Sequence, residues 1–268
     1  MLSRSTVFSR SEESIFSKFQ NTITIRKEFI QNKNYKPPEY TCEHFKRNIS
    51  KNRYEDVLCI DSTRVVLKER PPDTDYIHAS WMDMPDGQRY ISTQGPLQET
   101  LEDFWHMVYT EKSYVIVMLC CLREGEFGHF ERTFFEKKSS EPHCKPYQVN
   151  SKNLEDLGTV LGFTLEWPDY TAPLDPTPTV GLLKLVRNLS RSTPIVVHCS
   201  GGIGRSVFDY IAQKVKADSN VKMVDMFKDL RNRRFQGVQG IIQYTYLHVC
   251  VLELFVQVSI FEDPQELS

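Results

Sequence analysis

The sequence predicts an α/β (α+β) protein in which a twisted mixed β-sheet is flanked by helices. From residue 63 onward, several segments are rich in β-branched and aromatic side chains and are separated by turn-forming clusters such as PPDTD and MPDGQ. After residue 167 the segments acquire helical periodicity, with one short apolar strand, PIVVH, among them. This mixture of strands and helices favours a sheet with helices on its faces.

The individual elements follow from local patterns. Residues 13–30 carry apolar side chains near helical spacing, and the two prolines of YKPPEY interrupt that pattern. The predicted strands, several of them antiparallel neighbours, are TRVVLK, RYIST, SYVIVMLC, RTFFEK, GTVLGFTLEW and PIVVH. The predicted helices are LQETLEDFWHMVYTEK, TVGLLKLVRNLS, SVFDYIAQKVKA, VKMVDMFKDLRNR and IIQYTYLHVCVLELFVQ.

The composition is that of an ordinary globular protein. The 268 residues, 40% hydrophobic and 25% charged, can bury a full core in one large domain or two small ones. The net charge of -2 provides no basic field, so nucleic acid is not favoured as a partner. The most apolar runs, YVIVMLCCL and VCVLELFVQVSIF, are too short to span a bilayer, and we expect no transmembrane helix.

The cysteines and the N-terminus bear on the compartment. The seven cysteines are odd in number, scattered and without a C-x-x-C pair, which favours a reducing compartment over a disulfide scaffold or a zinc site. The first residues contain arginine and serine and no acid before Glu12, a faint likeness to a mitochondrial presequence. A disordered tail over residues 1–14 is the preferred interpretation, because the apolar face is weak.

The segment VHCSGGIGRS, Val197–Ser206, carries the strongest functional signal. It lies between the apolar strand and a predicted helix, where glycines let backbone N–H groups converge on an anion and the helix N-terminus adds positive charge. Five residues separate Cys199 from Arg205, so the guanidinium can return over the loop and bind two phosphate oxygens. The same surroundings favour the thiolate form, which predicts a nucleophile at Cys199.

Two other interpretations apply to this loop. In the first, the loop has a purely structural role, as a glycine-rich turn with a buried, inert cysteine. A nucleotide-binding P-loop is excluded, because that motif needs Gly-Lys-Ser/Thr where this chain has Gly-Arg-Ser.

The string HCSGGIGRS resembles the signature loop of the protein tyrosine phosphatases. The resemblance implies that Cys199 is the nucleophile, that Arg205 binds phosphate, and that Ser206 hydrogen-bonds the departing thiolate. It also implies that the loop residues bind the phosphate group and that His198 shapes the loop from below; the loop residues are Ser200, Gly201, Gly202, Ile203 and Gly204. Alone, this loop is also compatible with dual-specificity or lipid phosphatases.

The string KNRYEDV, Lys51–Val57, matches the phosphotyrosine-recognition loop of the same family and favours its phosphotyrosine-specific branch. The resemblance implies that Tyr54 stacks on the substrate ring and sets the pocket depth, while Asp56 holds the substrate backbone. A polar turn with a packing tyrosine is the alternative. DYIHAS and YISTQGPLQETLEDFWHMV follow the family's scaffold motifs, so we assign no catalysis to His78 or His106.

Three further matches complete the implied site. WPDYTAP, Trp167–Pro173, resembles the mobile lid, with Asp169 as general acid and Trp167 at the hinge; a proline-bounded surface turn is the alternative. LRNRRFQGVQGIIQY aligns with the glutamine loop and places Gln239 and Gln243 to orient the hydrolytic water, with Arg231 and Arg234 as support. Glu124 falls where the family has a glutamate that pairs with the signature arginine.

The sequence also departs from the family pattern. Gly201 replaces the usual alanine, Val207 stands where the family has glycine, and Phe163 occupies the place of a histidine. In the lid, Thr171 and Ala172 replace Gly-Val, and the Lys-Cys-x-x-Tyr-Trp-Pro segment is degraded to HFERTFF at residues 129–135. These changes leave the nucleophile, the arginine, the acid and both glutamines in place.

The resemblance, which covers residues 15 to 258, implies a protein tyrosine phosphatase-like fold with a catalytic domain at 15–258 and a C-terminal tail at 259–268. It implies hydrolysis of phosphotyrosine in proteins through a phosphocysteine, with no metal or cofactor, by a cytoplasmic, monomeric, non-receptor enzyme. The main alternative is a weakly active or inactive phosphotyrosine-binding module. A lipid or dual-specificity phosphatase is disfavoured by KNRYEDV and by the lack of a basic cluster near the signature loop.

Overall fold

The computed structural model of the protein describes residues 22–120, 123–124, 128–129, 148–154, 158–165, 167–168, 170–190, 192–204, 211, 214 and 221–261. The strands are β1 (Arg64–Val66), β2 (Tyr76–Asp83), β3 (Arg89–Gln94), β4 (Val115–Met118), β5 (Arg123–Glu124), β6 (Gly128–His129), β7 (Gln148–Leu154), β8 (Gly158–Thr164) and β9 (Ile195–Cys199). The helices are α2 (Thr22–Asn32), α3 (Glu43–Arg47), α4 (Leu101–Thr110), α5 (Thr177–Leu189), α7 (Met223–Arg233) and α8 (Ile241–Phe261), with short 3₁₀ turns η1 (Ile49–Lys51) and η2 (Gln98–Thr100).

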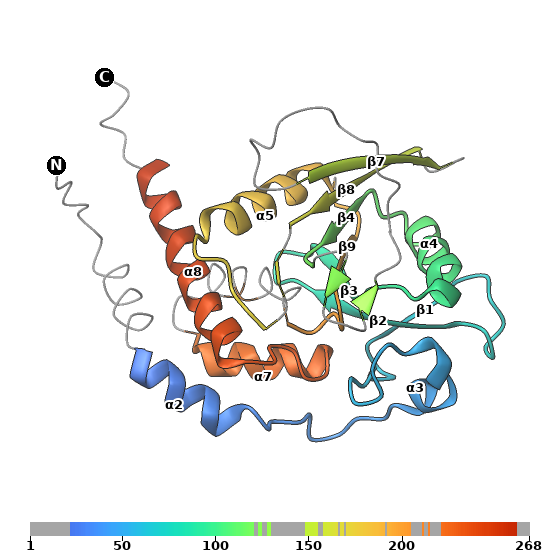
Figure 1. Cartoon of the computed structure of the whole chain (residues 1–268), viewed down its shortest axis with the longest axis horizontal. Coiled ribbons are helices and arrows are strands. Elements are labelled where there is room, and N and C mark those ends of the chain that lie inside the picture. The colour runs from blue at the N-terminus through green and yellow to red at the C-terminus, as the bar shows by residue number, and fades with distance from the viewer. Residues whose placement is uncertain are drawn as a thin grey trace.

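A twisted sheet forms the centre of the molecule (Figure 1). Within the described residues it has seven strands in the order β1-β2-β3-β9-β4-β8-β7, and β5 pairs separately with β6. The four central strands, β3, β9, β4 and β8, pair with one another in parallel. At the two edges of the sheet, β1, β2 and β7 pair with their neighbours antiparallel. Parallel strands end at the same sheet edge, and in open sheets ligands bind outside those carboxyl ends.

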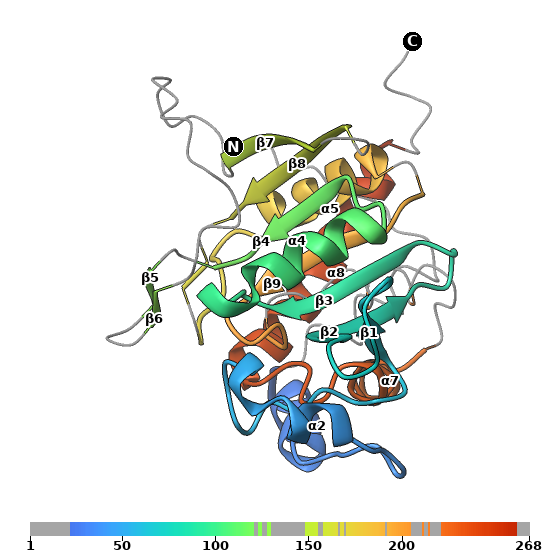
Figure 2. The same ribbon diagram turned by 90° about the vertical axis from the view of Figure 1, so that its right-hand side faces the viewer.

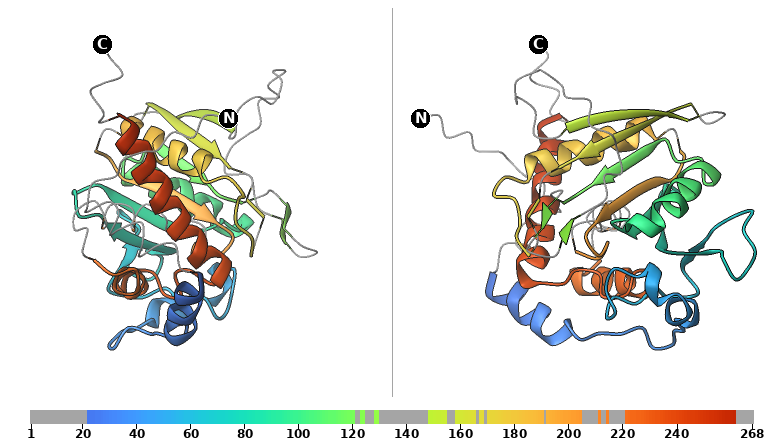
Figure 3. Two further views of the ribbon diagram at one scale, coloured as in Figure 1. Left: turned by 90° about the vertical axis from the view of Figure 1, so that its left-hand side faces the viewer. Right: turned by 45° about the vertical axis from the view of Figure 1, so that its right-hand side comes forward.

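Helices cover both faces of the sheet. On one face, α4 places Phe104, Met107 and Val108 against Ile116 of β4 and Val196 of β9. Figure 2 shows α4 in front of the sheet, with α5 and α8 on the other side. That second face is the larger core, to which α2, α5, α7 and α8 all contribute buried side chains. Figure 3 shows α8 crossing this side of the molecule, next to α2 at its lower end.

The predicted fold class, a mixed sheet flanked by helices, is confirmed. The sequence patterns did not predict the strands β2 and β7. β2 is buried along nearly its whole length although it contains His78 and Ser80, and polar residues dominate β7. RTFFEK and most of SVFDYIAQKVKA lie outside the described residues. No helix in the described part of the chain is long and apolar enough to cross a membrane.

Candidate active site

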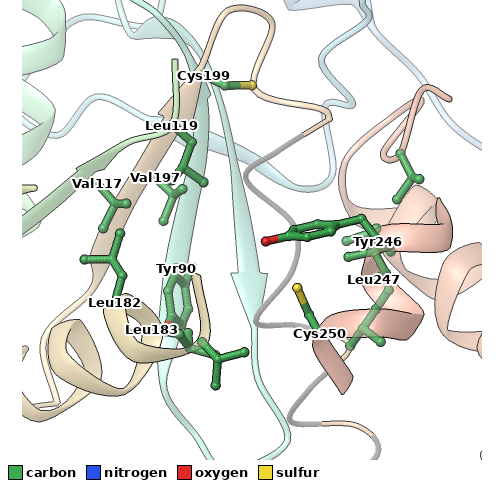
Figure 4. Close-up of a cluster of buried hydrophobic side chains, with 14 of the residues drawn as sticks. Tyr90, Val117, Leu119, Leu182, Leu183, Val197, Cys199, Tyr246, Leu247 and Cys250 are labelled. Carbon is green, nitrogen blue, oxygen red and sulfur yellow. The ribbon is translucent and has the colours of Figure 1, made fainter. Parts of the chain in front are cut away.

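The strand β9 carries the cysteine to the carboxyl edge of the parallel strands. All residues of IVVHC are buried, so the strand lies at the centre of the sheet, between β3 and β4. Cys199 is its last residue, and its side chain is 2% exposed at the top of the core shown in Figure 4. The rings of His198 and Phe104 meet in a T-shaped arrangement at 5.9 Å between centroids, and the role of His198 in shaping the loop stays a prediction.

The loop after Cys199 is held from one side by three hydrogen bonds to its carbonyl groups. Arg234 donates from Nη2 to the oxygen of Gly201 at 2.9 Å and from Nε to that of Gly202 at 3.0 Å. Ser92 also donates from Oγ to the oxygen of Gly202, at 2.9 Å. A trans peptide directs its N–H opposite to its C=O, so the N–H groups of Gly202 and Ile203 face away from Arg234. Consecutive amides turned to one side form an anion-binding nest.

The conformation of Gly202 makes this arrangement possible. Its φ is +68°, in the left-handed region that favours glycine, and a Cβ there would lie 2.1 Å from the backbone oxygen of Thr93. Gly201 differs, since a Cβ there would lie 3.5 Å from the side chains of Ile203 and Tyr54, at ordinary contact distance. The loop therefore requires glycine at position 202 but has room for alanine at 201.

Arg234 is fully buried and links the loop to the segment KNRYEDV. Burial lowers the pKa of its guanidinium. It also donates to Oγ of Ser80 at 3.1 Å and to Nδ1 of His78 at 3.0 Å. Nε2 of His78 in turn donates to the carbonyl of Val57 at 2.7 Å. Burial, together with the charge of Arg234, lowers the pKa of His78 to about 3, so the ring is neutral and can accept this hydrogen bond.

The segment KNRYEDV is fixed by its first three residues. Lys51 pairs with the carboxylate of Asp103 at 2.9 Å, and Asn52 accepts from the hydroxyl of Tyr76 at 2.6 Å. Arg53 is turned toward the end of β3, where its side chain donates to the carbonyl oxygens of residues 95 and 96 at 3.1 and 2.9 Å. The three polar side chains thus bind the scaffold, and of the residues that follow, 54–56 are exposed and Val57 is buried.

Tyr54, Glu55 and Asp56 are the exposed part of this segment. Tyr54 is 39% exposed, and its hydroxyl is hydrogen-bonded to Oγ of Ser200 in the signature loop. Its ring also lies beside Gly201. Asp56 is exposed. The amide of Gly95, the residue after β3, donates to the carbonyl of Ser200 at 2.9 Å, and its carbonyl accepts from Arg53, so this residue joins the two loops.

The glutamine segment is bonded directly to the signature loop. The amide of Val238 donates to the carbonyl of Ile203 at 2.6 Å. Arg231 supports the segment through bonds to the carbonyls of Gly237 and Val238, at 2.9 and 3.0 Å. Burial lowers the pKa of Arg231 to about 10. Val238 has a φ of +64°, a rare conformation for a β-branched residue, so the backbone is strained where it meets the loop.

Within this segment, Gln243 spans from Gln239 to the signature loop. Its Oε1 accepts the backbone N–H of Gln239 at 3.0 Å. Its Nε2 would lie 2.5 Å from a Cβ at Gly204, so the amide group rests directly on the loop glycine. Gln243 is 3% exposed, and among the described residues its Nε2 donates to no acceptor. A buried donor beside an anion-binding loop can serve a bound oxyanion.

The indole of Trp167 anchors the segment after β8. Trp167 is 3% exposed, and its ring meets that of Tyr246 on α8 edge to face, at 5.0 Å between centroids. Figure 4 shows Tyr246 reaching from α8 toward the sheet. Sequence reasoning did not identify Tyr246, because no local pattern links it to a residue so far away in the chain.

The comparisons with known proteins agree with this geometry. A sequence profile described as protein-tyrosine phosphatase matches residues 48–161 and 155–253. The chain belongs to the protein-tyrosine phosphatase family. Among relatives in this phosphatase family, it is 36% identical over 247 residues to the tyrosine-protein phosphatase Lar-like of Caenorhabditis elegans, an alignment that covers 80% of this chain and 11% of the relative.

Two vertebrate phosphatases are similar at a slightly lower level. The receptor-type tyrosine-protein phosphatase S of Gallus gallus is 32% identical over 243 residues, covering 80% of this chain and 16% of the relative. The human tyrosine-protein phosphatase non-receptor type 13 is 31% identical over 249 residues, covering 82% of this chain and 10% of the relative. The chain therefore spans only about a tenth to a sixth of the length of these phosphatases.

The described part of this phosphatase-family chain contains most, but not all, of the predicted site. The structure brings the cysteine, the loop residues 200–204, Tyr54 and Gln243 together at one edge of the sheet. Arg205, Ser206 and Asp169 lie outside the described residues, as do Val207 and residues 130–135. Glu124 is in β5, where its backbone pairs with Gly128 of β6.

Proposed function

We propose that this chain hydrolyses phosphotyrosine in proteins through a phosphocysteine intermediate. The observation that carries the proposal is the loop after Cys199, whose amides are turned to one side because Arg234 and Ser92 hold the carbonyls on the other. Amides fixed in this way are donors for the oxygens of a phosphoryl group, and they need no rearrangement as charge develops. Family membership supports the same reaction.

In the first step, Sγ of Cys199 attacks phosphorus in line. The S–P bond forms while the P–O bond to tyrosine breaks, and Asp169 transfers its proton to the leaving phenolic oxygen. Arg205 and the loop amides stabilise the equatorial oxygens. The products of this step are tyrosine and a phosphocysteine.

In the second step, water attacks the phosphocysteine. Asp169, now a carboxylate, accepts a proton from the water, Gln239 and Gln243 orient that water, and the S–P bond breaks to release inorganic phosphate. Ser206 donates to the departing thiolate. The position of Gln243 supports its part in this step, since its side chain lies on the glycine that ends the described loop.

The segment KNRYEDV, which contains Tyr54 and Asp56, supports selection for phosphotyrosine. Tyr54 lies at the side of the signature loop and is hydrogen-bonded to Ser200, so its ring forms a wall beside the phosphate position. We propose that this wall makes the site deep enough that the shorter side chain of phosphoserine does not reach Cys199. We propose phosphotyrosine-containing proteins as the substrates, with Asp56 holding their backbone.

We also propose that the domain acts as a monomer in the cytoplasm. The scattered, odd set of cysteines without a C-x-x-C pair supports a reducing compartment. Sedimentation of the purified protein tests the oligomeric state. A fluorescent fusion tests the location, and accumulation in the secretory pathway would contradict it.

The deciding experiment is phosphate release from a phosphotyrosine peptide, with a phosphoserine peptide as control substrate. We expect Cys199→Ser to abolish turnover and Asp169→Asn to reduce it about 10²- to 10⁴-fold, the usual contribution of a general acid. Asp73→Asn, which changes an exposed carboxylate away from the site, serves as the matched control and keeps wild-type turnover. Binding of the phosphotyrosine peptide without turnover, at equal affinity in wild type and Cys199→Ser, would make the chain a phosphotyrosine-binding module instead.

A further inference from the structure

The turn that contains the proposed acid is closed by a threonine side chain. The carbonyl oxygen of Pro168 accepts two hydrogen bonds from Thr171, one from Oγ1 at 2.7 Å and one from the backbone N–H at 3.4 Å. The hydroxyl bond is the shorter one and falls in the normal range for O–H donors, whereas the amide bond is long. The side chain of Thr171 is therefore the principal group that closes this turn.

The same threonine is held from a second direction. Nε1 of Trp167 donates to the carbonyl oxygen of Thr171 at 2.9 Å. The indole is itself fixed, because it is buried and packs against Tyr246, whose hydroxyl is hydrogen-bonded to Thr179 of α5 at 2.8 Å. Thr171 thus joins the turn to the core that is built by α5 and α8.

The backbone between these contacts is in a conformation that needs support. Tyr170 has a φ of +56°, in the left-handed region that costs free energy for a residue with a side chain, and its own side chain is 69% exposed. The two bonds from Thr171 to Pro168 close the turn around this residue and help to retain its conformation.

We propose that the Thr171 hydroxyl is a positioning residue for general acid catalysis by Asp169. The proposal rests on the proposed function, and Asp169 itself lies outside the described residues. The physical link is the peptide plane: the oxygen of Pro168 and the nitrogen of Asp169 belong to one rigid unit. Fixing that oxygen fixes the peptide plane that precedes Asp169 in the chain. A glycine at position 171 would keep the amide and carbonyl bonds but lack the hydroxyl bond.

The test compares two substrates that differ in their need for a proton. The phenol of tyrosine has a pKa of about 10 and leaves poorly without protonation. The phenol of para-nitrophenyl phosphate is more acidic and depends less on the acid. Thr171→Val keeps the shape and removes the hydroxyl. We expect its kcat/KM, which reports the formation of the phosphocysteine, to fall about two- to tenfold for a phosphotyrosine peptide, the equivalent of one neutral hydrogen bond, and to fall less for para-nitrophenyl phosphate.

Further variants separate positioning from folding. Thr171→Ser restores the hydroxyl and is expected to restore the wild-type ratio of the two kcat/KM values, and Thr171→Ala replaces Thr171→Val if the latter does not fold. Thr74→Val is the matched control, because Thr74 makes the same pair of bonds to the carbonyl of Pro71 in an exposed turn between β1 and β2. It should leave both kcat/KM values unchanged.

An equal fall for both substrates, or no fall for either, overturns the positioning role. So does a Thr171→Ser variant that behaves like Thr171→Val. Wild-type protein separates this failure from that of the proposed function: if wild type turns over neither substrate, the proposed function fails and the positioning role fails with it.

Discussion

The guanidinium of Arg234 lies beneath Gly202, with Nε 3.0 Å from its carbonyl oxygen. This contact comes from a residue that follows α7 and reaches a loop that follows β9. It orients the peptide units on either side of the glycine, and so it determines where the amides point. The quality of the proposed phosphate site therefore depends on a side chain that touches no substrate.

Arg234→Lys tests this dependence. A single ammonium group cannot reproduce the fork that serves two loop carbonyls, Ser80 and His78. We expect the free energy of unfolding to fall by about 2–4 kcal/mol, since buried acceptors lose their donors, and turnover to fall with it. Urea denaturation and phosphate release are the measurements. Arg70→Lys, at a more exposed ion pair with Glu102, should change stability by less than about 1 kcal/mol, and an equal effect of the two variants would refute the prediction.

Gly201→Ala and Gly202→Ala form a second, matched pair. The methyl group at position 201 finds ordinary contacts, and the substitution restricts the unfolded chain, so we expect stability to rise by about 0.4–1 kcal/mol with turnover preserved. The methyl group at position 202 meets the backbone of Thr93, and the φ of +68° adds strain, so this variant should be severely destabilised. Thermal unfolding compares them; similar melting temperatures would show that the loop geometry is wrong.

The neutral state of His78 predicts a pH dependence of stability. Its folded pKa, about 3, lies below the ordinary value of about 6.5, so the unfolded chain binds a proton that the folded chain does not. This contribution to stability is complete above pH 6.5 and is lost as the pH falls toward 3. The loss in the free energy of unfolding amounts to about 2 kcal/mol at pH 5.

His78→Gln retains a donor for the carbonyl of Val57 but cannot titrate. We expect its stability to depend less steeply on pH between 6.5 and 5 than that of wild type, as measured by urea denaturation at several pH values. His106→Gln is the control, because His106 also bonds a backbone carbonyl, that of Lys68, but at the surface. Equal slopes in wild type and His78→Gln would argue against a buried neutral imidazole.

The buried Nε2 of Gln243 predicts a role in oxyanion binding. Inorganic phosphate should raise the melting temperature of wild type, because a ligand of the folded state stabilises it. In Gln243→Met the donor is lost while the volume is similar, and we expect the dissociation constant of phosphate to rise about three- to tenfold. Gln257→Met, on the same helix but bonded to Lys184, should bind phosphate like wild type. Unchanged affinity in Gln243→Met would place the anion elsewhere.

The sequence predicted the fold class and the nature of the site because both depend on local signals. Apolar PIVVH predicts a strand where β9 is observed, and the anion-binding role of the glycine-rich run that follows it stays a prediction. β2 escaped prediction since His78 and Ser80 break its apolar pattern. Their burial makes sense only with Arg234, a residue distant in the chain that bonds to both.

The connections between segments were beyond sequence reasoning. Arg234 was predicted to support the glutamine segment, whereas in the structure its side chain donates to Gly201 and Gly202 of the loop after Cys199, a pairing that depends on the three-dimensional path of the chain. The contact between Trp167 and Tyr246 likewise joins the segment after β8 to α8. The replacement of glycine by threonine at position 171 is visible in the sequence, but only the structure gives its hydroxyl a definite acceptor.

The position of β4 has a consequence for how such chains can vary. Met118 pairs with His198 of β9 on one side and with Thr164 of β8 on the other. The strands that lead to the cysteine and to the acid segment thus end two interstrand spacings apart, roughly 10 Å. Backbone hydrogen bonds between the strands set this distance, and the length of the chain that connects β4 to β8 does not affect it. Insertions or deletions in that connection can therefore change its length without moving the end of β9 relative to the end of β8.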